Sequence, residues 1–288
     1  MRKTMMMTGG GCVLTVLVAL ACAAAQQGGA DPFAEFTRDW RDDRVWYDGK
    51  AEHAVYAASR DIYGQQRTYE ASIYTNKEHA DPETKTKSSG GSGREVFKHH
   101  VRDDIPTENY TYHYSTMCYV GTSDLKSLKI DMGSQEDCGS TFKQFVNHAG
   151  TLTWTQFSYF PDEGHRQGTY EPSAKLVYQD ALPVVLRGYP FDTPREIAVE
   201  LVVDQTTTHL SRAEPMDATI EYRGRATLSL PIGEIEAHHV RVTRADGVAH
   251  DYWFDAGDER QHVMVQYTGP GGQSYRLKSW RRWAYWER

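Results

Sequence analysis

The feature that most constrains the fold is an alternation of polar residues with apolar or aromatic residues along much of the chain. It runs through residues 67–74, 110–114, 151–160, 198–203 and 218–230. Successive side chains of an extended strand point to opposite faces, so this period of two predicts strands with one buried and one solvated face. We therefore predict a mostly β protein, built either as two curved antiparallel sheets or as one rolled, barrel-like sheet, with one short linking helix.

Turn sequences and breaks in the pattern divide the chain. Turns at Arg223-Gly224, 245–247 and 269–272 space the last strands as a meander of hairpins. The polar, Gly- and Ser-rich stretch 83–93 is typical of a solvated loop. Apolar residues recur at nearly helical spacing in 173–187, where Pro183 is tolerated only near a first turn, so a short helix is expected there.

These boundaries give a predicted organisation of four parts. It comprises a signal peptide (1–25), an N-terminal linker (26–42), a β-rich half (43–172) and a second β-rich half with a short leading helix (173–288).

The first part resembles an export signal. Arg2 and Lys3 precede an apolar run at 12–20 and the small residues 21–25, a segment too short to span a bilayer as a permanent helix. We therefore expect an extracytoplasmic protein, in the periplasm or outer cell envelope. Two processing routes stay open: lipidation of Cys22 at a loose lipobox, which would be the sole membrane attachment, or cleavage after Ala25.

Charge and motif content disfavour several classes of function. A net charge of −7 and a pI near 5.9 give no electrostatic footprint for nucleic acid. The sequence has no nucleophile elbow, phosphate loop or dinucleotide-binding glycine pattern. Adjacent histidines at 99–100 and 238–239 would point to opposite faces of a strand, which disfavours shared metal ligation. We expect no cofactor, no metal and no nucleic-acid partner.

Two cysteines follow the export signal. Cys118 and Cys138 form an even pair in a chain expected in an oxidising compartment, so we predict a disulfide between them. The alternative is that Cys138 is a nucleophile, with Ser140 and His148 as its partners.

The best acidic cluster lies at the end of a predicted strand. Asp162, Glu163 and His165 would supply general acid and base groups at a loop, as in a polysaccharide hydrolase or lyase. The alternative is a strand that leads into an acidic turn without catalytic function.

Several segments resemble known families. The segments 45–52, 112–117, 134–139 and 156–164 resemble, in this order, motifs of an uncharacterised family of exported bacterial β-rich proteins. The segments 180–188, 231–233 and 252–254 are similar to a bacterial domain of unknown function built as a rolled antiparallel sheet. The resemblance implies a fold but no agreed activity. Relatives are sometimes mislabelled septum-formation inhibitor, and the family pattern has a cysteine at Cys138 but not at Cys118.

Two classes of function therefore remain, and the sequence favours the first. The first is a non-enzymatic envelope protein that binds a lipid, a glycan or a partner protein in a concave aromatic sheet face. Its expected ligand-binding residues are Tyr110, Tyr112, Tyr114, Gln135 and Tyr159, although the tyrosine row also fits an ordinary core. The second is the hydrolase or lyase.

The segment 280–288 is interpreted as a last strand, with a membrane-interface anchor as its alternative.

Overall fold

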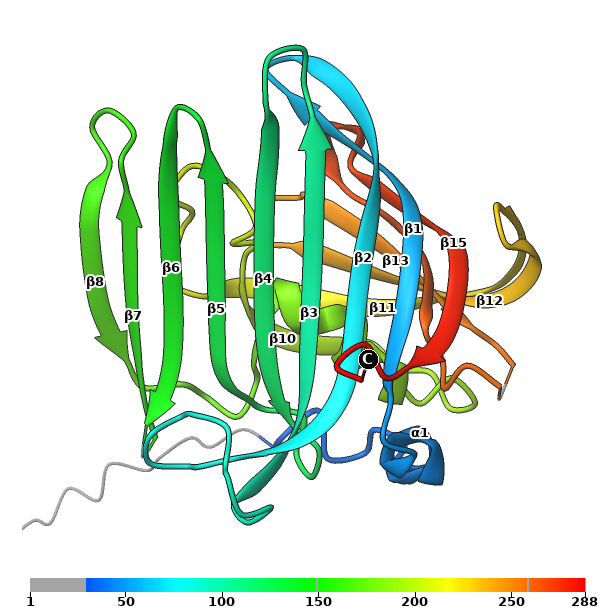
Figure 1. Cartoon of the computed structure of the whole chain (residues 1–288). Coiled ribbons are helices and arrows are strands. Elements are labelled where there is room, and N and C mark those ends of the chain that lie inside the picture. The colour runs from blue at the N-terminus through cyan, green and yellow to red at the C-terminus, as the bar shows by residue number, and fades with distance from the viewer. Residues whose placement is uncertain (1–29, 149, 258, 288) are drawn as a thin grey trace, which may run out of the picture.

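The computed structural model describes residues 30–148, 150–257 and 259–287, and these form one curved sheet (Figure 1). The sheet has 15 strands in the order β8-β7-β6-β5-β4-β3-β2-β1-β15-β14-β13-β12-β11-β10-β9. All neighbours are antiparallel except β9 and β10. The order follows the sequence around a circle that is open between β8 and β9, so the sheet curls without closing.

The first half of the chain supplies one side of the sheet. Its strands are β1 (Ala51–Ile62), β2 (Gln65–Ala80), β3 (Arg94–Pro106), β4 (Thr111–Gly121), β5 (Ser127–Glu136), β6 (Gly139–His148), β7 (Thr151–Ser158) and β8 (Gly164–Tyr170). The second half supplies β9 (Leu176–Tyr178), β10 (Ile197–Val202), β11 (Met216–Leu230), β12 (Gly233–Arg244), β13 (Ala249–Asp255), β14 (Met264–Thr268) and β15 (Ser274–Trp283). The two halves join where β1 pairs with β15.

Helical segments in the described part of the chain are few and short. The α-helices are α1 (Asp39–Asp42) and α2 (Leu182–Val185), and the 3₁₀ turns are η1 (Arg44–Tyr47), η2 (Gln179–Ala181), η3 (Leu186–Gly188) and η4 (Pro270–Gly272). No helix within the described ranges has both the length and the apolar character needed to cross a bilayer.

The prediction of a mostly β, rolled sheet is confirmed. The turns at 245–247 and 269–272 lie between strands as expected. Arg223-Gly224 instead lies inside β11, where the pairing with β12 shifts register and forms a β-bulge. The predicted helix at 173–187 is reduced to α2 with flanking 3₁₀ turns, and Pro183 lies in its first turn.

The segment expected to be a linker is partly packed into the core. Phe33, Phe36 and Trp40 are buried, and the Trp40 ring stacks on Phe97 of β3 with centroids 5.0 Å apart. Residues from 30 onward therefore cover one end of the sheet.

The predicted disulfide is wrong, because Cys118 and Cys138 are both free thiols. Cys118 is buried in β4 opposite Ile130, whereas Cys138 lies in the turn after Glu136, at the far end of β5. Six residues of strand, at about 3.3 Å each, place the two cysteines about 20 Å apart, well beyond the roughly 7 Å limit for a bridge.

The concave face is filled by chain from the second half. The segment from β9 to η3 packs there: Arg187 donates two hydrogen bonds to Glu52 of β1, at 3.0 and 2.6 Å. The connection between β10 and β11, residues 203–215, also enters this face and is called the inner loop below. The curved sheet is therefore largely occupied by its own chain.

Candidate functional site

The inner loop is held by polar side chains that project from the concave face. Lys143 of β6 is fully buried, and its Nζ donates to the carbonyl oxygens of Gln205 and His209 at 2.9 and 2.7 Å. Burial lowers the pKa of Lys143 to about 8. Gln156 of β7 donates to the Gln205 side chain and to the Ser211 carbonyl. These bonds fix the loop's path, since each satisfies a buried backbone or amide group.

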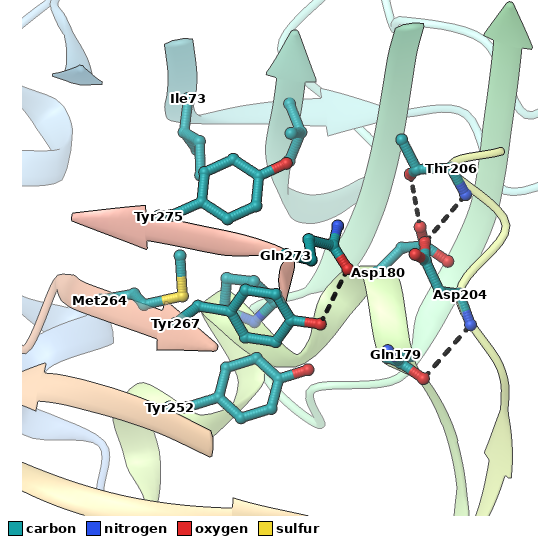
Figure 2. Close-up of a pocket in the computed structure, with 12 residues that line it drawn as sticks. Ile73, Gln179, Asp180, Asp204, Thr206, Tyr252, Met264, Tyr267, Gln273 and Tyr275 are labelled. Carbon is teal, nitrogen blue, oxygen red and sulfur yellow. Dashed lines mark hydrogen bonds between the residues drawn. The ribbon is translucent and has the colours of Figure 1, made fainter. Parts of the chain in front are cut away.

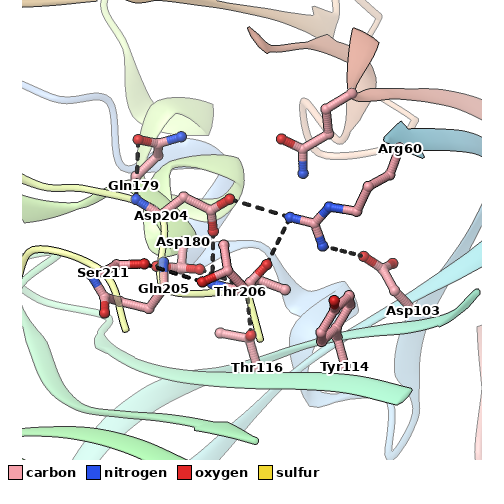
Figure 3. Close-up of polar contacts among 12 residues, drawn as sticks. Arg60, Asp103, Tyr114, Thr116, Gln179, Asp180, Asp204, Gln205, Thr206 and Ser211 are labelled. Carbon is pink, nitrogen blue, oxygen red and sulfur yellow. Dashed lines mark hydrogen bonds and ion pairs between the residues drawn. The ribbon is translucent and has the colours of Figure 1, made fainter. Parts of the chain in front are cut away.

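A second set of contacts surrounds Arg60 of β1 (Figure 3). Its Nη2 donates to the Thr206 carbonyl at 2.7 Å and lies 3.6 Å from Asp204 Oδ2, while Nη1 lies 4.0 Å from Asp103 Oδ2. Nη1 has no hydrogen-bond partner among the described residues, and the guanidinium lies 5.1 Å from the centroid of the Tyr114 ring. The arginine therefore has two carboxylate neighbours but only one short hydrogen bond.

Two hollows adjoin these contacts: Asp204 and Thr206 line one, and Arg60 lines the other. The first hollow, the inner cavity, has a volume of about 60 Å³. Figure 2 shows that carboxyl, amide and tyrosine side chains converge on it. Its polar lining comprises Gln179, Asp180, Asp204, Thr206, Tyr252, Tyr267, Gln273 and Tyr275. This volume suits a few water molecules rather than an organic ligand.

The inner cavity contains a pair of carboxyl groups. Asp180 accepts hydrogen bonds from the Gln205 backbone N–H at 3.0 Å and from the Thr206 hydroxyl at 2.8 Å. Burial and the neighbouring Asp204 raise the pKa of Asp180 to about 8, so the two carboxyl groups hold a proton at neutral pH. Tyr252 is buried, and its hydroxyl points into the cavity (Figure 2). The arrangement fits ordered water.

The second hollow, the tyrosine pocket, has a volume of about 210 Å³. It is lined by Arg60, Asp61, Ile62, Tyr63, Tyr112, Tyr114, Thr207, Thr208 and His209. The Tyr114 hydroxyl bonds to Thr208 Oγ1 at 2.8 Å, and Thr208 donates to Glu136 at 3.0 Å. The pocket thus lies between the β1–β2 turn and the inner loop, and the Tyr114 ring is held in place by the hydrogen bond of its hydroxyl to Thr208.

Tyr63 lies at the mouth of this pocket in an unfavourable backbone conformation. The β1–β2 turn is Tyr63-Gly64, with φ of 56° and 74°. Positive φ at both positions is typical of a type I′ hairpin turn, in which the first position favours Asn, Asp or Gly, not a bulky aromatic residue. The Tyr63 side chain is nevertheless 74% exposed, and its ring meets the Tyr112 ring edge-on with centroids 6.1 Å apart. The strain is not explained by core packing.

The basic side chains of the tyrosine pocket already lie beside carboxylates. Arg60 has Asp103 and Asp204 beside it, and His209 Nδ1 lies 2.8 Å from Glu163 Oε1. Asp61 accepts a hydrogen bond from the Gly64 backbone N–H at 2.9 Å. The pocket therefore has polar and aromatic walls without a large surplus of either charge.

The structure brings together three of the five expected ligand-binding residues. Tyr110, Tyr112 and Tyr114 form a continuous row with centroids 5.3 and 6.1 Å apart, and the last two line the pocket. Gln135 lies elsewhere, because it is exposed on the outer face of β5, between the buried Ser134 and Glu136. Tyr159 is 80% exposed at the rim of the sheet and does not line the pocket.

The three expected catalytic residues do not converge. Glu163 points inward, where its Oε2 accepts the Leu210 backbone N–H at 3.1 Å. Although burial opposes ionisation, hydrogen bonds from Ser158, His209 and Leu210 lower the pKa of Glu163, which is unsuited to a general acid. His165 stacks on Phe157 on the outer face, with centroids 4.2 Å apart, and Asp162 is exposed in the turn. The geometry assigns Glu163 to anchoring the inner loop.

Sequence reasoning missed Tyr63, Arg60 and the inner loop. A signal for Tyr63 was present, because Tyr63-Gly64 separates two alternating runs at the place of a two-residue hairpin turn. Arg60 and Asp180 gave no such signal, because their partners come from distant parts of the chain.

Comparison of the chain with protein-family models, with curated proteins and with solved structures gives no match. The fold and the pocket geometry therefore stand as the basis for the functional proposal.

Proposed function

We propose that this is an exported, non-enzymatic binding protein that holds one sugar unit of a neutral glycan in the tyrosine pocket. The observation that carries the proposal is Tyr63, an exposed aromatic ring kept at the pocket mouth by a turn that disfavours it. Strained residues that core packing does not require are concentrated at ligand-binding sites. The export signal and Cys22 lie outside the described residues, so export remains part of the proposal.

The wall chemistry favours a sugar over other ligands. Sugar rings have C–H faces that pack on aromatic rings and hydroxyl edges that exchange hydrogen bonds with groups such as those of Tyr112 and Thr208. Because Arg60 and His209 already lie beside carboxylates, a strongly anionic ligand would find no unneutralised cation in the pocket.

Size separates a glycan from a lipid. The tyrosine pocket, about 210 Å³, is smaller than the about 300–1,000 Å³ typical of sites for drug-sized molecules. Acyl chains need a long apolar channel. The inner loop, which Lys143 and Gln156 hold in place, occupies the concave face where such a channel would run. A single ring at the end of a longer chain fits this space.

The test is a glycan array of neutral, amino and acidic sugars, followed by saturation-transfer NMR and titration calorimetry on the sugars that bind. Tyr63→Asn removes the aromatic lip but suits the turn, so we expect at least about five-fold weaker binding with an unchanged or higher melting temperature, since an aromatic contact contributes about 1 kcal/mol.

Phe142→Ala is the matched control, because it removes an aromatic ring that is 42% exposed on the outer face of β6. It should leave sugar binding unchanged. An array without signal, or binding that Tyr63→Asn does not weaken, contradicts the proposal. Cleavage of a bound glycan would restore the hydrolase alternative.

A further inference from the structure

The outer face of the sheet has an aromatic and cationic cluster that the proposed function does not use. It spans β15, β1, β2 and β3 and continues into the residues after β15. We call it the outer patch, and its members are His53, Tyr74, His100, Arg102, Arg281, Trp283, Tyr285 and Trp286. The chain after β15 turns back across β1 and β2 (Figure 1).

The rings of the outer patch form a continuous layer. His53 stacks on Tyr74 with centroids 4.3 Å apart, and Tyr74 contacts Tyr285 at 5.1 Å. Trp283, Tyr285 and Trp286 remain 38%, 39% and 50% exposed, although they contact one another. Three neighbouring aromatic side chains with this exposure indicate an interaction surface rather than scattered surface residues.

The two arginines of the outer patch differ in their partners. Arg102 is paired with Asp104, whose Oδ2 lies 2.9 Å from the Arg102 Nε. Arg281 lies over the Trp283 ring, 4.2 Å from its centroid, and among the described residues it has no carboxylate partner. Its Nε donates instead to His53 Nδ1 at 3.3 Å. Burial and then the charges of Arg281 and Arg102 lower the pKa of His53. The patch thus has an unneutralised cation on a chain of net charge −7.

We propose that the outer patch docks the protein on the surface of an anionic phospholipid bilayer. Tryptophan and tyrosine are enriched where proteins meet the headgroup region, because their rings have an apolar body and a polar edge. An unpaired arginine adds attraction to anionic headgroups. The patch lies on the face opposite the tyrosine pocket, so docking leaves that pocket open and does not depend on its ligand.

The test is co-sedimentation of the protein with vesicles of phosphatidylcholine alone and of an equal mixture with phosphatidylglycerol. We expect binding to the anionic vesicles that weakens as salt is added, since the attraction is screened. Arg281→Gln should weaken binding about five-fold, the effect of about 1 kcal/mol per basic residue near the surface. Trp283→Ala should weaken binding to the same vesicles at both low and high salt.

Arg223→Gln is the matched control. It removes the same charge from β11, outside the patch, where Arg223 is paired with Glu221. It should bind vesicles as the unmodified protein does. Three results would overturn the proposal. They are equal binding to both vesicle types, no binding to either, and an Arg223→Gln effect as large as that of Arg281→Gln. Retention on dextran sulfate without vesicle binding would also overturn it, assigning the patch to an anionic polysaccharide. Circular dichroism checks that each variant folds. If Trp283→Ala does not fold, Trp286→Ala replaces it.

Discussion

Among the described residues, the buried arginines Arg187 and Arg60 both lie at the concave face, and they are held very differently. Arg187 makes a bidentate pair with Glu52, at 3.0 and 2.6 Å, and its guanidinium lies 5.8 and 5.9 Å from the Trp40 and Trp46 rings. Arg60 has carboxylate neighbours at 3.6 and 4.0 Å and a terminal nitrogen without a hydrogen-bond partner in the described part of the chain. The first lies in packed core, and the second lines the tyrosine pocket.

This difference distinguishes buried polar groups that hold the structure together from buried polar groups that are available to bind a ligand. A fully hydrogen-bonded buried pair holds two segments in one arrangement, here η3 against β1. A charged group left partly unsatisfied beside open space keeps hydrogen-bonding capacity for water or a ligand. The same residue type therefore marks the core at one end of the sheet and a candidate binding site at the other.

The largest expected effect on stability follows from breaking the Arg187–Glu52 pair. Glu52→Gln leaves Arg187 charged and buried, so we expect the free energy of unfolding to fall by about 3–5 kcal/mol. Arg60→Met should cost less, because its carboxylate neighbours are farther away. Urea unfolding measures both. Glu70→Gln, at the exposed Glu70–Lys278 pair, is the control and should change stability by under about 0.5 kcal/mol. An equal loss for Arg60→Met would remove the distinction between the two arginines.

The next effect concerns pH at the inner cavity. The folded-state pKa of Asp180, about 8, exceeds the ordinary value of 3.8, so its contribution to stability is fully present below about pH 4 and is lost as pH rises toward 8. Asp180→Asn removes this titration. Relative to the variant, the unmodified protein should therefore lose about 3–4 kcal/mol between about pH 5 and pH 8.

Urea unfolding of both proteins across this pH range gives that difference directly. Taking the difference cancels histidines that titrate in both proteins, such as His99, whose pKa burial lowers to about 3. A difference that does not change with pH would show that Asp180 is ionised in the folded protein.

A smaller effect is expected where the inner loop is anchored. Lys143→Met keeps the apolar stem but leaves the carbonyls of Gln205 and His209 without their donor, at an expected cost of about 2 kcal/mol. Limited proteolysis should then cut within residues 203–215 faster than in the unmodified protein. Lys129→Met, at the Lys129–Asp131 pair, is the matched control and should leave the cleavage rate unchanged.

The sequence supported the fold better than the site, for physical reasons. Alternation reports which face of a strand is buried, and it correctly placed Tyr112 and Tyr114 on the inward face. It carries no information on what fills the curved sheet, so the inner loop was missed. Arg60 meets Thr206 across 146 positions of sequence, a pairing that only the folded chain reveals. Glu163 was misinterpreted for the same reason, since its partner His209 lies 46 positions away.

The last comparison is one of chemical reactivity, between a cysteine in the packed core and a cysteine at the open rim. Cys118 is fully buried, and burial raises the pKa of its thiol, so it should resist alkylation in the folded protein. Cys138 is exposed in the β5–β6 turn, with its Sγ 3.2 Å from the Tyr110 hydroxyl, and should react. Peptide mapping after iodoacetamide treatment should find label at Cys138 alone, and at both residues after unfolding. Label at neither position in the unreduced, unfolded protein would restore the disulfide and overturn the strand register that keeps the two thiols apart.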